Sequence, residues 1–170
     1  MELHMHSHQF ARRAPDWRAA AVGGFFAGVV ILVLGGLAMW ATGGNPAEAM
    51  RRVSAVMLGR DALSQPAVID AGIALSALIV HIALSVVMGL ILATIMAPFS
   101  LDSSVGMASV VGILFGVAMY WFNFHAMTHA FPWFADARGW LALVFNIVFG
   151  LVTAEAYMRI ERRGAGSSKG

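Results

Sequence analysis

The chain has 170 residues, of which 59% are hydrophobic and only 12% are charged. A soluble domain has about 25% charged residues, so this composition indicates a membrane protein. The net charge of +2 is too small for a protein held to nucleic acid by phosphate contacts, and the lack of cysteine excludes disulfides, iron–sulfur clusters and thiolate zinc sites.

Four apolar stretches are long enough to cross a bilayer, which takes about 20 residues. They are residues 19–42, 68–97, 105–124 and 139–158. The sequence therefore predicts an all-α integral membrane protein, a four-transmembrane-helix bundle. Its principal partner is the lipid bilayer, and we expect no nucleic-acid partner.

A shorter helix is predicted between the first two spans, over residues 46–58. Asn45 is a typical N-cap, Pro46 suits the first helical position and Glu48 suits the third. Apolar residues then recur at helical spacing beside Arg51 and Arg52. This pattern predicts either a short amphipathic helix on the outer membrane surface or a connector packed on the bundle.

Positive charge predicts the orientation, because cytoplasmic segments of membrane proteins are enriched in Lys and Arg. With four spans, both ends of the chain lie on one side. That side holds seven of the eleven basic residues, namely Arg12, Arg13, Arg18, Arg159, Arg162, Arg163 and Lys169. We therefore expect both termini in the cytoplasm. Residues 1–18 and 161–170 are predicted to be flexible tails that flank a membrane domain of residues 19–160.

Each span also has one face of small or polar residues. The glycines on these faces are Gly24, Gly28 and Gly35 in the first span, Gly112 and Gly116 in the third, and Gly139 and Gly150 in the fourth. Two pairs have the G-x-x-x-G spacing that lets membrane helices approach closely. Such faces on all four helices predict a tight bundle whose inner surface collects the polar groups.

His81 is the most informative single residue, because residues 71–101 around it contain no Asp, Glu, Lys or Arg. An ionisable residue inside a membrane is a functional-site hypothesis. By helical face and depth, Asn146 is its expected hydrogen-bonding companion. The full predicted intramembrane polar cluster is His81, Asn146, Tyr120, Asn123, Ser85 and Asp70. Such a set could lock the helices together or line an outward-facing polar cavity.

Histidines also raise the question of metal binding. His125 and His129 are four residues apart, so one helical face could present both, but only Asp136 is nearby as a third ligand. Short histidine-rich tracts bind metal as well. The chain has one such tract, made of His4, His6 and His8. Interfacial packing explains the first pair more simply.

A haem on His81 would need a second ligand at similar depth, for which Met88 and Met119 are the candidates. A structural histidine explains His81 better, so we expect no haem or other cofactor. Glu155 is the one acid deep in a span, and Arg159 follows four residues later, which favours an ion pair. No arrangement of nucleophile and base emerges, and we expect no enzyme.

The distinctive outer segments are residues 44–63 (GNPAEAMRRVSAVMLGRDAL) and 120–140 (YWFNFHAMTHAFPWFADARGW). They and the spans between resemble an uncharacterised family of small bacterial four-helix inner-membrane proteins. The resemblance covers residues 19–158 and implies a bacterial inner-membrane location, with no catalytic residues to carry over. Some members are labelled sodium:proline symporters, although such symporters are built from two repeats of five helices.

These patterns lead to one expected function and two alternatives. The first is a non-enzymatic accessory or structural subunit of a larger membrane complex, associating with other subunits or with further copies of itself. The second is a small transporter or channel-like oligomer that uses a polar cavity at His81 and Asn146. The third is a membrane protein that binds haem or a divalent metal.

Overall fold

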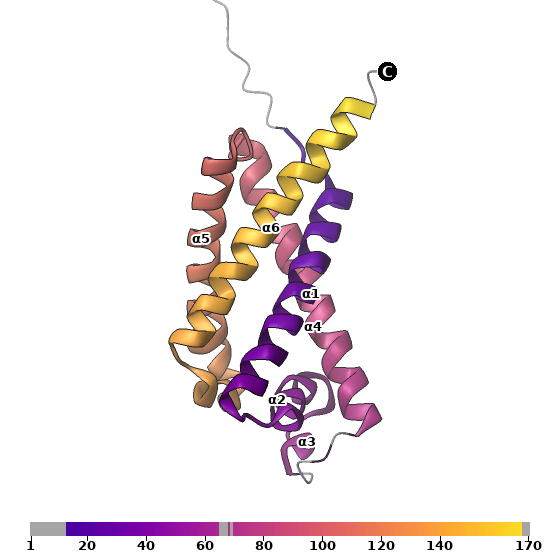
Figure 1. Ribbon diagram of the computed structural model, residues 1–170, viewed down its shortest axis with the longest axis vertical. Coiled ribbons are helices and arrows are strands. Elements are labelled where there is room, and N and C mark those ends of the chain that lie inside the picture. Colours follow the sequence, from indigo (N-terminus) through magenta and orange to yellow (C-terminus); the bar gives the residue numbers. More distant parts are fainter. Residues whose placement is uncertain (1–12, 65–67, 69, 168–170) are drawn as a thin grey trace, which may run out of the picture.

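The computed structural model describes residues 13–64, 68 and 70–167. Every regular element in this part of the chain is a helix, as the composition predicted (Figure 1). The α-helices are α1 (Trp17–Thr42), α2 (Pro46–Leu58), α3 (Asp61–Ser64), α4 (Ala71–Met96), α5 (Val105–Trp121) and α6 (Trp140–Ser167). Four segments, α1, α4, α5 with its continuation to His129, and α6, are long and apolar enough to cross a membrane.

Polar side chains begin several of these helices by accepting hydrogen bonds from free backbone N–H groups. Asp16 begins α1, Asp70 begins α4 and Ser104 begins α5, each over distances between 2.8 and 3.2 Å. Asn45 caps α2 in the same way at 3.0 Å, and α2 runs over the predicted residues 46–58. Local capping chemistry therefore sets where the helices start.

Two inner boundaries differ from the prediction. α4 begins at Ala71 rather than at residue 68, because the side chain of Asp70 caps it there. Regular α-helix in the third span ends at Trp121 rather than at residue 124. A π-helical turn, η2 (Phe122–Ala126), follows, and two 3-10 turns, η3 (Met127–His129) and η4 (Pro132–Ala137), lead to α6.

Both predicted tails are partly ordered where they meet the bundle. α6 continues to Ser167, so residues 161–167, predicted as flexible tail, are helical. At the other end Arg13 is held by ion pairs, and Trp17 and Arg18 already belong to α1. The ion pairs explain why order extends beyond the apolar core. The predicted metal tract, His4, His6 and His8, lies outside the described residues.

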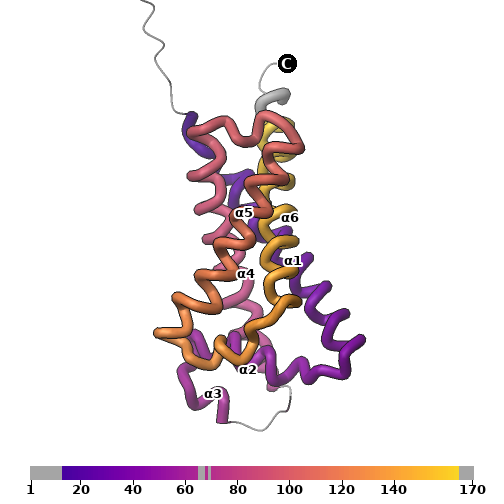
Figure 2. The backbone as a smooth tube through the Cα atoms, turned by 90° about the vertical axis from the view of Figure 1, so that its left-hand side faces the viewer, coloured from indigo at the N-terminus to yellow at the C-terminus, as the bar shows by residue number. Residues whose placement is uncertain are grey.

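The two described chain ends lie at the same end of the molecule (Figure 1). We call this the termini end, and we call the opposite end, which carries α2, α3 and the turns before α6, the loop end. α1 packs against α4 and α6, and α5 packs against α6, whereas α4 contacts α5 and α6 only weakly. Figure 2 shows α1 and α5 leaning apart toward the loop end.

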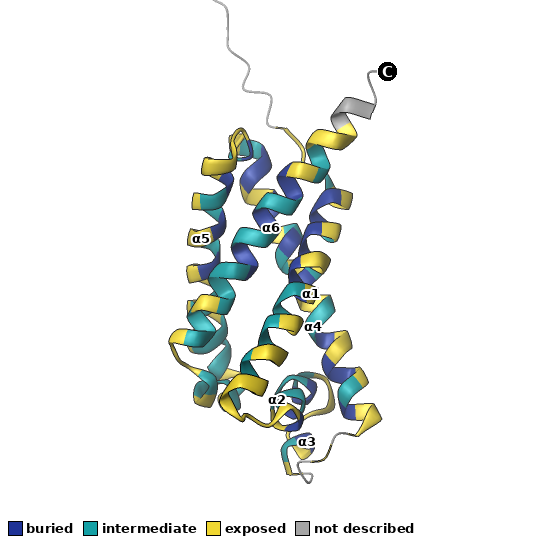
Figure 3. Cartoon of the chain, viewed as in Figure 1, coloured by how far each residue is buried: buried dark blue, intermediate teal, exposed yellow. Residues whose placement is uncertain are grey.

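The closely packed core occupies the termini half of the bundle (Figure 3). Its fully buried members include Leu92 and Met96 of α4 and Tyr157 and Met158 of α6. All buried residues of α1 lie between Ala19 and Gly28. The predicted tight bundle is therefore found in one half only, and the expectation that Gly35 belongs to a packing face is wrong, since a side chain there would meet nothing within 4 Å.

At the loop end, α2 covers α4. Its buried residues, Ala47, Arg51, Ser54 and Ala55, fall on one helical face. Trp133 of η4 fastens α2 from another side, since its indole N–H donates a 2.9 Å hydrogen bond to the carbonyl of Arg52. These contacts agree with the interpretation of α2 as a connector packed on the bundle.

Candidate functional site

Two glycine crossings define the shape of the bundle. In the first, α1 meets α4: a Cβ on Gly24 would come closer than 3.0 Å to the carbonyl oxygen of Ser85, and one on Gly28 would lie 2.6 Å from the Ser85 hydroxyl. In the second, α5 meets α6. Cβ atoms there would collide with backbone in the same way, at Gly112, Gly116 and Gly150. The absence of side chains at these positions is what allows the helix backbones to touch.

His81 of α4 lies next to the first crossing and makes its hydrogen bond there. Its Nε2 is 3.0 Å from the carbonyl oxygen of Gly28 on α1. A carbonyl oxygen only accepts, so Nε2 carries the proton. The predicted bond between His81 and Asn146 is therefore wrong: the crossing brings a backbone carbonyl of α1 to the imidazole first.

Asn146 of α6 has a different partner. Its Oδ1 accepts a 3.2 Å hydrogen bond from Nδ2 of Asn123, and its own Nδ2 donates to the carbonyl of Ala142 at 2.8 Å. Interhelical bonds of this kind are worth about 0.6–2 kcal/mol in membranes. The amide pair therefore ties the turn after α5 to α6, not α4 to α6.

Both hydrogen-bonded groups face one cavity of about 390 Å³ in the loop half. His81, Ser85, Asn123 and Asn146 are the polar side chains in its wall. The remaining wall is apolar and rich in aromatic rings, including Phe122, Phe124, Phe134, Phe145 and Phe149. Cavities of about 300–1,000 Å³ with apolar walls and a few polar groups are typical of small-molecule sites. The cavity lies between α4, which contacts α5 only weakly, and the residues of η2 and α6.

The π-helical turn η2 shapes one side of this cavity. The N–H of Met127 donates to the carbonyl of Phe122, five residues back, which widens the turn. As a result Phe122, Asn123, Phe124 and Met127 all reach the wall. Turns of this kind occur frequently at functional sites.

Two members of the predicted cluster lie elsewhere. Asp70 caps the start of α4, eleven residues before His81 or about 16 Å along the helix. Tyr120 packs its ring against Phe124 and His125, with ring centroids 5.2 and 5.9 Å away. The cluster is therefore smaller than predicted, and Asp70 and Tyr120 have structural roles outside the cavity wall.

The histidines proposed for metal binding are at the loop end. His125 lies in the π turn and stacks on Trp121, with a centroid distance of 6.2 Å and an interplanar angle of 8°. His129 lies in η3, where the change of helix type removes the regular spacing on which a shared face depends. Within the described part of the chain, no three His, Asp or Glu side chains are grouped to hold a metal ion.

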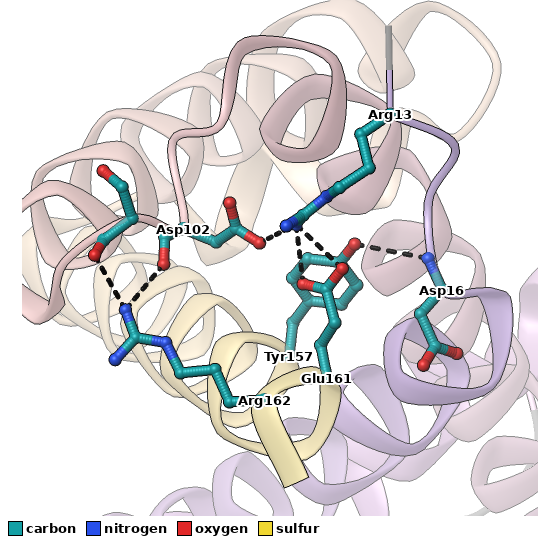
Figure 4. Close-up of polar contacts among 7 residues, drawn as sticks. Arg13, Asp16, Asp102, Tyr157, Glu161 and Arg162 are labelled. Carbon is teal, nitrogen blue, oxygen red and sulfur yellow. Dashed lines mark hydrogen bonds and ion pairs between the residues drawn. The ribbon is translucent and has the colours of Figure 1, made fainter. Parts of the chain in front are cut away.

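A second polar cluster, which the sequence analysis missed, lies at the termini end (Figure 4). Arg13 forms ion pairs with Asp102, in the loop between α4 and α5, and with Glu161 of α6, the latter at 2.8 Å. Arg162 donates to the carbonyls of Asp102 and Ser103 at 3.0 and 2.8 Å. We call Arg13, Asp102, Glu161 and Arg162 the termini clamp, since they join three separate segments.

The clamp holds Asp102 in its ionised form. Burial opposes ionisation, but hydrogen bonds with Glu161 and Arg13 outweigh it and hold the pKa of Asp102 below its ordinary value of 3.8. Burial likewise disfavours the charged Arg13, yet the neighbouring carboxylates raise the pKa of Arg13 above its ordinary value. The pair of Arg13 and Asp102 therefore stays charged at neutral pH.

One signal in the sequence could have indicated the clamp. Asp102 is the only charged residue of the short loop between the second and third spans, on the side where most basic residues gather. An acid in that position is a natural partner for a tail arginine. The deeper pair predicted on α6 does form, since Arg159 lies 3.1 Å from Glu155.

No family model, curated protein or solved structure matches this chain. A function is therefore inferred from the geometry of its own residues.

Proposed function

We propose that the chain is a multi-pass membrane protein that binds a small, mainly apolar molecule in its loop-half cavity and performs no chemistry on it. The observation that carries this proposal is the cavity of about 390 Å³, walled by aromatic and aliphatic side chains with a few polar groups. A partly open hollow with this kind of wall can take up a small apolar molecule.

Binding fits the geometry better than a continuous channel does. A channel along the bundle axis would have to pass the termini half, where Leu92, Met96, Tyr157 and Met158 are at most 1% exposed. The cavity thus has a closed floor on that side. A transporter would need this floor to open, and the glycine crossings hold it shut through backbone contact.

We place the protein in the bacterial inner membrane with both termini in the cytoplasm. Four helices of sufficient length support the membrane location. The seven basic residues at the termini side, against four at the other, support the orientation. The cavity then opens in the outer half of the bilayer, with α2 near the outer surface.

The test is binding of naphthalene, an apolar probe without hydrogen-bonding groups, to the protein in lipid nanodiscs, with empty nanodiscs as the blank. We expect saturable binding with one site per chain. Ala142→Phe fills the cavity from its wall and should weaken binding at least tenfold. Val144→Phe places the same large side chain on the exposed face of the same helix and should leave binding unchanged. Absence of saturable binding to the unmodified protein would refute the proposal.

A second candidate function is an accessory subunit of a larger membrane complex. It is favoured by the loop half of α1, which leans away from the bundle and has no buried residue beyond Gly28 (Figure 2). Val33, Leu37 and Trp40 are 57%, 57% and 85% exposed. Cysteine cross-linking from position 37 in native membranes tests it, with position 107 of α5 as the exposed control. A discrete product from position 37 alone supports a partner, and none from either position counts against one.

A further inference from the structure

The hydrogen-bonding roles of the polar groups in the cavity wall are set by the backbone. The Gly28 carbonyl accepts from Nε2 of His81, at 3.0 Å. In the neutral ring the other nitrogen, Nδ1, is then an acceptor without a hydrogen. A neutral His81 can therefore offer a ligand an acceptor and no donor.

The same reasoning fixes both amides. The Ala142 carbonyl accepts from Asn146, so the nitrogen of that amide is Nδ2 and its Oδ1 must be the group that accepts from Asn123. Asn123 consequently donates with Nδ2, and its own Oδ1 remains as an acceptor. Each amide nitrogen also has a second N–H. The cavity wall thus combines free acceptors on His81 and Asn123 with amide donors.

We propose that the ligand of this cavity is an alcohol or phenol, that is, an apolar body with a hydroxyl group. This inference rests on the proposed function and adds the chemical class of the ligand. A hydroxyl is the smallest group that donates to the His81 acceptor and accepts from an amide N–H. A ketone or an ether only accepts, which would leave the imidazole nitrogen unpaired in an apolar cavity.

The charge of the cavity wall also favours a neutral ligand. Among the described residues that line the cavity, none is Asp, Glu, Lys or Arg. An ionised ligand would lose its hydration without gaining an opposite charge, which is strongly unfavourable. A neutral molecule with one or two hydroxyl groups satisfies the wall without that penalty.

The experiment compares two probes of nearly equal shape, 2-naphthol and its methyl ether 2-methoxynaphthalene, in the nanodisc assay. Partition into empty nanodiscs is subtracted for each. We expect 2-naphthol to bind about three- to tenfold more tightly, the range that one added hydrogen bond provides. If both probes bind with equal affinity, the alcohol proposal is wrong while the binding proposal stands. If neither probe nor naphthalene binds, the proposed function itself has failed.

Variants assign the preference to His81. His81→Gln keeps one donor for Gly28 and one acceptor for the ligand, so it should retain the preference for 2-naphthol. His81→Phe removes both and leaves only the Asn123 acceptor, so it should weaken the preference for 2-naphthol. Naphthalene provides the control for folding, because a variant that still binds it has an intact cavity. A full preference for 2-naphthol in His81→Phe would contradict the assignment.

A hydroxyl ligand could come from the bilayer or from solution. Dioleoylglycerol added to the nanodisc and benzyl alcohol added to the buffer are therefore tested as competitors of 2-naphthol. Displacement by the first points to a lipid alcohol, and displacement by the second alone points to a soluble one. Displacement by neither would count against hydroxyl recognition.

Discussion

The termini half and the loop half of the bundle are packed differently, although the same long apolar helices run through both. In the termini half, α1 and α4 touch through Gly24, Gly28 and Gly89, and residues such as Leu92 are fully buried. In the loop half the same helices separate, and aromatic side chains surround a cavity. The same apolar helices are thus packed tightly at one end and held apart at the other.

The difference shows what determines packing between membrane helices. Lipid tails are as apolar as leucine, so apolar side chains alone supply little drive for helices to associate. Glycine and alanine permit close backbone contact, whereas large side chains keep backbones apart. The phenylalanines of η2 and α6 therefore explain the open half as directly as the glycines explain the closed half.

The difference in packing between the two halves is tested most directly by adding the same methyl group to each half of α1. Gly24→Ala puts a Cβ closer than 3.0 Å to the Ser85 carbonyl, so we expect the free energy of unfolding to fall by about 3 kcal/mol. Gly35→Ala meets nothing within 4 Å and should be neutral or slightly stabilising. Unfolding in mixed micelles measures both. Equal effects would show that the two halves are not packed differently.

Leucine-to-alanine substitutions test the same difference in packing, because each removes the contacts that its side chain makes. Leu92 is fully buried, so Leu92→Ala should cost about 2 kcal/mol, the low end for such truncations because lipid solvates the unfolded chain. Leu84 is in the cavity wall and 42% exposed. Leu84→Ala removes few contacts, and we expect a loss below about 0.5 kcal/mol. A loss as large as that of Leu92→Ala would mean that the cavity is filled by tight packing.

The helices were predictable from the sequence because their signals are local. Asn45, Pro46 and Glu48 mark the start of α2 within four residues, and the glycine spacing marks where helices can meet. The partner of His81 was not predictable in this way. It depends on the angle and rotation at which α1 crosses α4, which bring the Gly28 carbonyl to the imidazole.

The termini clamp escaped prediction for a related reason. Arg13 and Glu161 lie in segments whose composition is typical of flexible tails. They become ordered only because the fold brings them to Asp102, 89 residues from Arg13 along the chain. The wide turn of η2 was likewise hidden, since its sequence suits a regular α-helix.

The ion pairs at the two ends of the molecule should differ in how much they stabilise the fold. Asp102→Asn removes the buried partner of Arg13, and we expect a loss of about 1 kcal/mol, moderated because the Arg13 side chain is 47% exposed. Glu48→Gln removes the exposed pair with Arg52 at the loop end and should cost less than about 0.5 kcal/mol. Thermal unfolding at pH 7 measures both losses.

The dependence on pH distinguishes a charge effect from a change of shape. The pKa of Asp102 is lowered in the folded protein, so its stabilisation is complete above the ordinary value of 3.8 and is lost as the pH falls below it. The difference in stability between the unmodified protein and Asp102→Asn should therefore shrink as the pH is lowered from 4 toward 2. A difference that stays constant over this window would rule out the ion pair as its source.

Coupling energies between pairs of side chains show which polar pair joins the helices around the cavity. Asn123 and Asn146 share a hydrogen bond, so a double-mutant cycle with alanine should give a coupling energy of about 0.6 kcal/mol. His81 bonds to Gly28 instead, and its cycle with Asn146 should give a coupling near zero. The reverse result would restore the His81–Asn146 pair expected from helical face and depth. The hydroxyl ligand would then lose its free acceptor on His81, because that nitrogen would already be engaged across the cavity.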